Sequence, residues 1–96
     1  MSPPNGGGGD GDASDIRLKQ DIHLLGKSAA GIPVYSFKYR DDMKDYLREN
    51  VDTQSIYFGA MAQDLLHLVP EAVNVDPSGY YSVDYSMIDV DFIKLV

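Results

Sequence analysis

Apolar and polar side chains alternate along residues 32–40, and this is the clearest periodic pattern in the 96-residue chain. Tyr35, Phe37 and Tyr39 share one face of the segment, whereas Val34 and Lys38 share the other. A period of two that is rich in aromatic and β-branched residues predicts a half-buried β-strand. We interpret the three aromatic residues as core or interface residues.

A second pattern predicts a strand, a glycine and a helix between residues 55 and 70. Residues 55–59 are rich in β-formers and end at Gly59, and the apolar positions of residues 61–69 have helical spacing. Pro70 is expected to stop this helix because it cannot continue the backbone hydrogen bonding. Further along, the β-prone runs 72–75 and 80–85 flank the sequence Asp-Pro-Ser-Gly, which favours a tight turn, so they should pair as an antiparallel hairpin.

Three other segments are less well defined by their pattern. Residues 14–25 fit a short helix and an extended segment equally well. Residues 41–53 are charged and suit a surface excursion or a short helix. At the end of the chain, Ser86 is a plausible N-cap for a final helix whose apolar face would include Met87 and Phe92.

The pattern as a whole predicts one small α+β domain with a mostly antiparallel sheet and short helices. Residues 1–13 are dominated by Gly, Pro and Asp, and we interpret them as a disordered linker, with the folded domain spanning residues 14–96. Roughly 80 folded residues bury only about 60% of their unfolded surface, so a partner chain or a packed aromatic cluster should add to stability.

Composition excludes several classes of function. Fifteen acidic and eight basic residues give a formal charge of −7, which argues against nucleic acid and membrane partners. The chain has no Cys, and it contains no metal-ligand spacing, no phosphate-binding glycine loop and no nucleophile elbow. We therefore expect neither a cofactor nor a metal ion.

Three short motifs occur in order along the chain: Ser-Asp-Ile-Arg-Leu-Lys at residues 14–19, Gly-Ala-Met-Ala-Gln-Asp at residues 59–64, and Tyr-Ser-Val-Asp-Tyr-Ser at residues 81–86. Together they resemble the S74 peptidase family of intramolecular chaperone auto-processing domains. Such domains are found at the C-terminal end of phage tail fibres and endosialidase tailspikes, and also in the myelin regulatory factor. In that family the domain assists trimeric folding of the preceding chain and then cuts itself off.

The resemblance implies a function for named residues. The scissile bond would be Ala13–Ser14, Ser14 would be the nucleophile, and Lys19 would be the general base of a Ser-Lys dyad. The partners would be two further copies of the chain, in a homotrimer, and a preceding fibre or passenger segment. A Lys amine can take the Ser proton only if burial or a nearby positive charge lowers its pKa, and Arg17 could supply such a charge. Gln63 is a candidate for orienting the site.

The spacing of Ser14 and Lys19 leaves an alternative open. Five residues along a helix place two side chains about 140° apart, and along a strand they point to opposite faces, so a bend or a second chain must bring the pair together. Without the family, the pair would be interpreted as a helix cap and a surface lysine. Family members usually end in a long helix, whereas here about ten residues follow Ser86. The alternative function is therefore a non-catalytic assembly or protein-binding module with the same fold.

Overall fold

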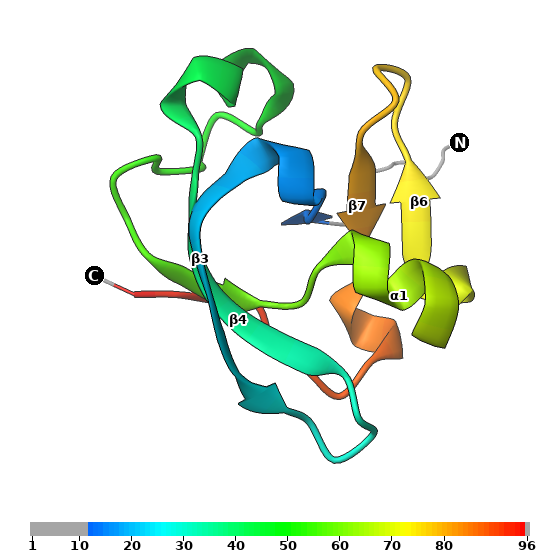
Figure 1. Cartoon of the computed structure of the whole chain (residues 1–96). Helices are drawn as coiled ribbons and strands as arrows, with labels where there is room; N and C mark the ends of the chain where they lie inside the picture. Colours follow the sequence, from blue (N-terminus) through cyan, green and yellow to red (C-terminus); the bar gives the residue numbers. More distant parts are fainter. Residues whose placement is uncertain (1–11, 96) are drawn as a thin grey trace.

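Two antiparallel β-sheets and a few short helices make up residues 12–95, the part of the chain that the computed structural model describes (Figure 1). The strands are β2 (Asp12–Ala13), β3 (Lys19–Lys27), β4 (Pro33–Tyr39), β5 (Tyr57–Gly59), β6 (Val73–Val75), β7 (Tyr81–Val83) and β8 (Ile93–Lys94). The helical elements are α1 (Ala62–Leu68) and the 3-10 turns η1 (Ile16–Leu18), η2 (Asp41–Tyr46), η3 (Pro70–Ala72) and η4 (Tyr85–Met87). The predicted α+β class is confirmed.

The larger sheet has the strand order β3-β4-β5-β8, and the smaller sheet has the order β2-β7-β6. In Figure 1, β3 and β4 lie on one side of the molecule and the β6–β7 hairpin on the other, with η1 between them and α1 below the hairpin. One core cluster surrounds α1 and includes Leu65 and Val83, and the other gathers the aromatic residues of β4 and β5 with Leu18. The site described below lies where these two clusters meet.

The strongest sequence patterns correspond to observed elements. The alternating segment forms β4, and Phe37 and Tyr39 are buried on its inner face. The helical pattern forms α1, which ends before Pro70. The predicted hairpin is confirmed as β6 and β7, with Val73 opposite Val83 and a turn that closes through a hydrogen bond from the Gly79 N–H to the Asp76 carbonyl.

The segment that the pattern left open, residues 14–25, contains both kinds of structure. Asp15 caps the 3-10 turn η1 by accepting a hydrogen bond from the Arg17 N–H, and the chain then becomes extended at Lys19. Strand β3 pairs with β4 from this residue onward, with Lys19 opposite Tyr39. The turn followed by a strand supplies the bend that the Ser14 and Lys19 side chains require.

Two predictions, one near each end of the chain, are wrong. The final helix does not form: Asp84, rather than Ser86, caps the short turn η4, and the chain then extends into β8, which pairs with β5. Phe92 instead stacks on Tyr57 with ring centroids 5.2 Å apart, so tertiary packing outweighs the local helical pattern. The predicted linker also ends earlier than expected, because Asp12 and Ala13 pair with β7 as an edge strand, whereas residues 1–11 lie outside the described part.

Among residues 12–95, no helix has both the length and the apolar character that crossing a membrane requires.

Candidate active site

Ser14 is fully buried between β2 and η1, and its backbone is anchored on both sides. The Ser14 N–H donates to the Tyr81 carbonyl at 3.2 Å, and the Ser14 carbonyl accepts a hydrogen bond of 2.9 Å from the N–H of Ala62, the first residue of α1. The Ser14 hydroxyl donates to the Ala60 carbonyl oxygen at 2.7 Å. The residue that the first motif marks as a nucleophile is thus held in one position by β7, by the first residue of α1 and by Ala60, which follows β5.

Lys19 reaches the same point from the start of β3. Its side chain is only 4% exposed, and its Nζ lies 3.0 Å from Ser14 Oγ and 3.1 Å from the Ala60 carbonyl oxygen. Nζ also lies 3.9 Å from the centroid of the Phe37 ring. The bend at η1 therefore brings together, within a single chain, the two residues of the predicted dyad.

The surroundings of Lys19 favour its neutral form. Burial lowers the pKa of its amine well below the ordinary value of 10.5, and the nearby negative charge of Asp15 offsets this effect only in part. Among the residues that the structure describes, no carboxylate lies within ion-pairing distance of Nζ. A neutral amine at hydrogen-bonding distance from a serine hydroxyl has the geometry of a general base.

The Ser14 proton must change its partner before Lys19 can accept it. In the observed geometry the hydroxyl points at the Ala60 carbonyl, and Nζ donates to Oγ. Because Nζ and the Ala60 oxygen are both within hydrogen-bonding distance of Oγ, rotating the hydroxyl about the Cβ–Oγ bond redirects the hydrogen without moving a heavy atom. The arrangement can therefore switch from a resting to a proton-transfer geometry at small cost.

Asp15 is also fully buried, yet it is surrounded by hydrogen-bond donors. It accepts bonds from the Arg17 backbone N–H, from Arg17 Nε and Nη2, from Gln63 Nε2 and from the Tyr81 N–H, at 2.7–3.0 Å. Burial by itself would raise the pKa of the carboxyl group, but the hydrogen bonds from Arg17, Tyr81 and Gln63 outweigh burial and hold the pKa well below its usual range.

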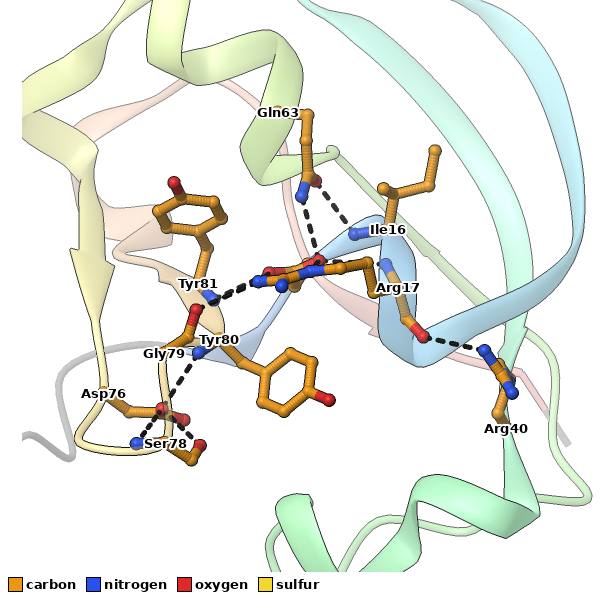
Figure 2. Close-up of polar contacts among 10 residues, drawn as sticks. Ile16, Arg17, Arg40, Gln63, Asp76, Ser78, Gly79, Tyr80 and Tyr81 are labelled. Atoms are coloured by element: carbon orange, nitrogen blue, oxygen red, sulfur yellow. Dashed lines mark hydrogen bonds and ion pairs between the residues drawn. The ribbon is translucent and has the colours of Figure 1, made fainter.

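Gln63 and Arg17 secure the turn that carries the predicted dyad (Figure 2). Gln63 reaches from α1 toward η1, where its Oε1 accepts a hydrogen bond of 2.8 Å from the Ile16 N–H. Arg17 extends over the β6–β7 turn, donates to the Gly79 carbonyl at 2.9 Å and lies 4.6 Å from the centre of the Tyr80 ring. Both residues hold η1 against the rest of the domain.

The expectation that Arg17 lowers the pKa of Lys19 is wrong. Its guanidinium forms an ion pair of 2.7 Å with Asp15, its side chain is 54% exposed, and it is not among the groups that shift Lys19. Burial lowers the pKa of Lys19 instead.

Tyr85 and Ala60 complete the cluster, although the sequence marks neither as a site residue. The Tyr85 hydroxyl lies 3.1 Å from Ser14 Oγ and accepts a hydrogen bond of 3.0 Å from the Ala60 N–H. Burial raises the pKa of this phenol to about 12 although its hydrogen bonds with Ser14 and Ala60 oppose the shift, so it stays protonated at neutral pH. The sequence feature that could have identified Tyr85 is the third motif, which includes this residue.

The structure explains why the second motif has a glycine at position 59. A Cβ atom on Gly59 would lie 2.5 Å from the Tyr85 hydroxyl, which is closer than non-bonded atoms approach. Only glycine therefore lets Tyr85 reach both Ala60 and Ser14. The second and third motifs thus meet at the first one, which explains in physical terms why the three occur together.

Ala13, the residue before Ser14, presents its carbonyl oxygen to Tyr39. The Tyr39 hydroxyl donates to this oxygen at 2.5 Å, and the Tyr39 side chain is only 1% exposed. Alternation along the strand predicts Tyr39 as a core aromatic, which is correct for its ring, but that pattern contains no information about the partner of its hydroxyl.

The described residues contain no group of three or more His, Asp or Glu side chains arranged to hold a metal ion.

Comparison with protein families gives a significant match. Residues 14–74 match the family model Peptidase_S74, described as chaperone of endosialidase. This segment covers more than half of the chain and contains Ser14, Lys19 and Gln63. Searches of curated proteins and of solved structures return no significant match.

The family match thus assigns the chain to a class of chaperone domains. The chain belongs to the peptidase S74 family, the chaperones of endosialidase. Membership of this family supports a chaperone role in fibre assembly.

Proposed function

We propose that this chaperone domain cuts its own backbone between Ala13 and Ser14, with Ser14 as the nucleophile and Lys19 as the general base. The observation that carries the proposal is the distance of 3.0 Å between Lys19 Nζ and Ser14 Oγ, in a site where burial lowers the pKa of the lysine. A Ser hydroxyl becomes an effective nucleophile when an adjacent neutral amine removes its proton.

In the first step, Ser14 Oγ bonds to the Ala13 carbonyl carbon while its proton moves to Lys19 Nζ. The C–N bond between Ala13 and Ser14 then breaks, and Lys19 returns the proton to the Ser14 nitrogen. The result is an ester between the Ala13 carbonyl and Ser14 Oγ, together with a free Ser14 amine. This step needs no second chain, because the nucleophile and the bond that it attacks belong to neighbouring residues.

In the second step, a water molecule adds to the ester carbon and gives a proton to Lys19. The bond between that carbon and Oγ breaks, and Oγ takes the proton from Lys19. The products are a segment that ends at Ala13 with a carboxylic acid and a domain that begins at Ser14 with a free amine. Lys19 returns to its neutral form. The reaction occurs once in each chain, because the bond that is cut is its only substrate.

We further propose that the domain acts as a homotrimer and assists the folding of a preceding fibre or passenger segment. Family membership supports this assignment. Within the described residues, Leu24 and Leu25 lie exposed on β3, the outermost strand of the larger sheet, and are available for contact between copies. Cleavage would then separate the assembled fibre from its chaperone.

The test is intact mass spectrometry of the folded chain after incubation, at a concentration at which its oligomeric state has been measured. The parent is expected to lose residues 1–13, whereas Ser14→Ala and Lys19→Met should keep the full-length mass. Lys27→Met is the matched control, since Lys27 is exposed on the same strand and should cleave as the parent does. A folded, assembled parent that keeps its full length would overturn the proposal and leave the non-catalytic assembly module as the function.

A further inference from the structure

Formation of the ester places a negative charge on the Ala13 carbonyl oxygen, and that charge needs a donor. Acyl-transfer sites stabilise it with hydrogen bonds that are in place before the reaction begins. We propose that the Tyr39 hydroxyl is this donor, so that Tyr39 is a third catalytic residue beside Ser14 and Lys19. The inference rests on the proposed self-cleavage, because the charge develops only if Ser14 attacks Ala13.

Tyr39 already contacts the atom on which the charge would form. Its hydroxyl donates to the Ala13 carbonyl oxygen at 2.5 Å, in the uncleaved chain. An oxyanion is a much stronger acceptor than an amide carbonyl, so the same bond strengthens as the reaction proceeds. A bond that is stronger in the transition state than in the ground state lowers the barrier.

The position of Tyr39 is set by the same strand pair that sets the position of Lys19. The two residues are direct partners in the β3–β4 register, and Lys19 Nζ lies 6.0 Å from the centre of the Tyr39 ring. Side chains of directly opposed residues on neighbouring strands project to the same face. One cross-strand pair therefore brings the base to Ser14 Oγ and the donor to the Ala13 carbonyl oxygen.

Aromatic packing keeps the Tyr39 ring from moving. Its centroid lies 5.4 Å from that of Phe37 and 5.1 Å from that of Tyr57, both in edge-to-face geometry. Burial raises the pKa of the Tyr39 phenol far above its ordinary value of 10.0, so the group remains a donor at any pH at which the protein is studied. A fixed donor requires little reorganisation during the reaction.

Ala13 and Tyr39 also border a cavity that can hold water. This cavity of about 160 Å³ is lined by Asp12, Ala13, Tyr39, Arg48 and Asn50, among others. A water molecule occupies about 30 Å³ in the liquid, so this cavity has room for several. The Tyr39 hydroxyl would then serve both steps, because hydrolysis of the ester develops charge on the same oxygen.

The decisive variant is Tyr39→Phe, which removes the hydroxyl and keeps the ring. Its rate constant for loss of residues 1–13 is expected to fall about 10²- to 10³-fold, as for removal of one oxyanion donor in other acyl-transfer enzymes. The matched control is Tyr35→Phe, which removes from the same strand a hydroxyl that donates to Asp64 at 2.9 Å. The control should cleave at the rate of the parent.

The outcomes separate the two proposals. A parent that does not cleave contradicts the proposed function, whereas a parent and a Tyr39→Phe variant that cleave equally fast contradict only the role of Tyr39. If Tyr39→Phe does not fold, as judged by circular dichroism, 3-fluorotyrosine at position 39 decides. This substitution keeps the ring and makes the phenol more acidic, hence a stronger donor, so cleavage should be faster than in the parent. A rate equal to or below that of the parent would overturn the inference.

Discussion

Two ionisable side chains on either side of η1, Asp15 and Lys19, are both buried but have opposite surroundings. Asp15 is encircled by donors, including the Arg17 guanidinium. Lys19 faces a serine hydroxyl, a backbone carbonyl, a methionine sulfur and an aromatic ring. The first environment supports a charge, and the second favours its loss.

The contrast teaches that burial alone does not determine ionisation. Burial opposes the charge at both positions, and the outcome depends on whether enough oppositely polarised partners replace the lost water. Arg17 contributes to the first outcome, because its ion pair of 2.7 Å with Asp15 keeps the carboxylate charged.

The largest expected effect follows from removing Asp15. In a Ser14→Ala background, which keeps the chain intact, Asp15→Ala should lower the free energy of unfolding by about 3 kcal/mol at pH 7, because it leaves several hydrogen-bond donors around a buried position without an acceptor. Asp42→Ala is the control, since Asp42 pairs with Arg40 at the same distance of 2.7 Å but at the surface, and it should cost at most about 1 kcal/mol. Urea denaturation at pH 7 measures both.

The pH dependence of this effect has a definite sign. Because folding lowers the pKa of Asp15, its contribution is complete above the unfolded carboxyl pKa of about 3.9 and is lost as the pH falls toward the lower folded value. The difference in the free energy of unfolding between the Ser14→Ala protein and its Asp15→Ala derivative should therefore become smaller at acidic pH. Equal losses for Asp15→Ala and Asp42→Ala at pH 7 would show that the buried carboxylate contributes no more to stability than an exposed one.

An intermediate effect of opposite sign is expected at Lys19. Folding lowers the pKa of this amine, so between the folded value and the unfolded value of about 10.4 the unfolded chain binds more protons, and stability rises with pH. Lys19→Met removes the cost of neutralising the amine, which is about 1.4 kcal/mol for each unit of the shift. In the Ser14→Ala background this variant should be more stable than its parent at pH 7.

The stability gain of Lys19→Met should shrink as the pH approaches 10, and unfolding curves at several pH values measure this slope. Lys27→Met, on the exposed part of β3, should show neither the gain nor the slope. A Lys19→Met variant that is less stable than its parent at pH 7 would mean that Lys19 keeps its charge, and the contrast with Asp15 would disappear.

The smallest expected effect concerns Gln63, whose side chain links Asp15 to the backbone of η1. Gln63→Ala removes the hydrogen bonds to Asp15 and from Ile16 and should cost about 1–2 kcal/mol in the Ser14→Ala background. Gln54→Ala is the control because Gln54 is exposed. Thermal unfolding followed by circular dichroism compares the two, and an equal loss would show that Gln63 does not stabilise η1.

Sequence reasoning predicted well the elements whose pattern agrees with their packing. In β4 the alternation and the burial coincide, and in α1 the apolar spacing and Pro70 act in the same direction. The C-terminal segment was mispredicted because its helical spacing is local, whereas the stacking of Phe92 on Tyr57 and the pairing of β8 with β5 are not.

The site was predictable to the extent that motifs mark it. Ser14 and Lys19 belong to one motif, and the structure places them together. Tyr39, Ala60 and Tyr85 were missed because their contribution depends on contacts between residues that are 25 to 71 positions apart. Backbone carbonyls, such as that of Ala60, carry no sequence signal of their own, since every residue has one.

The distance in sequence between Ser14 and Tyr85 has a consequence for timing. The Tyr85 hydroxyl docks only after the hairpin and η4 have formed, so the surroundings of Ser14 are complete only when nearly the whole domain has folded. A half-folded chain would expose Lys19 to water and leave it protonated and inert. Cleavage at this site would thus occur only after the domain has folded, and hydrolysis of the bond would make the step irreversible.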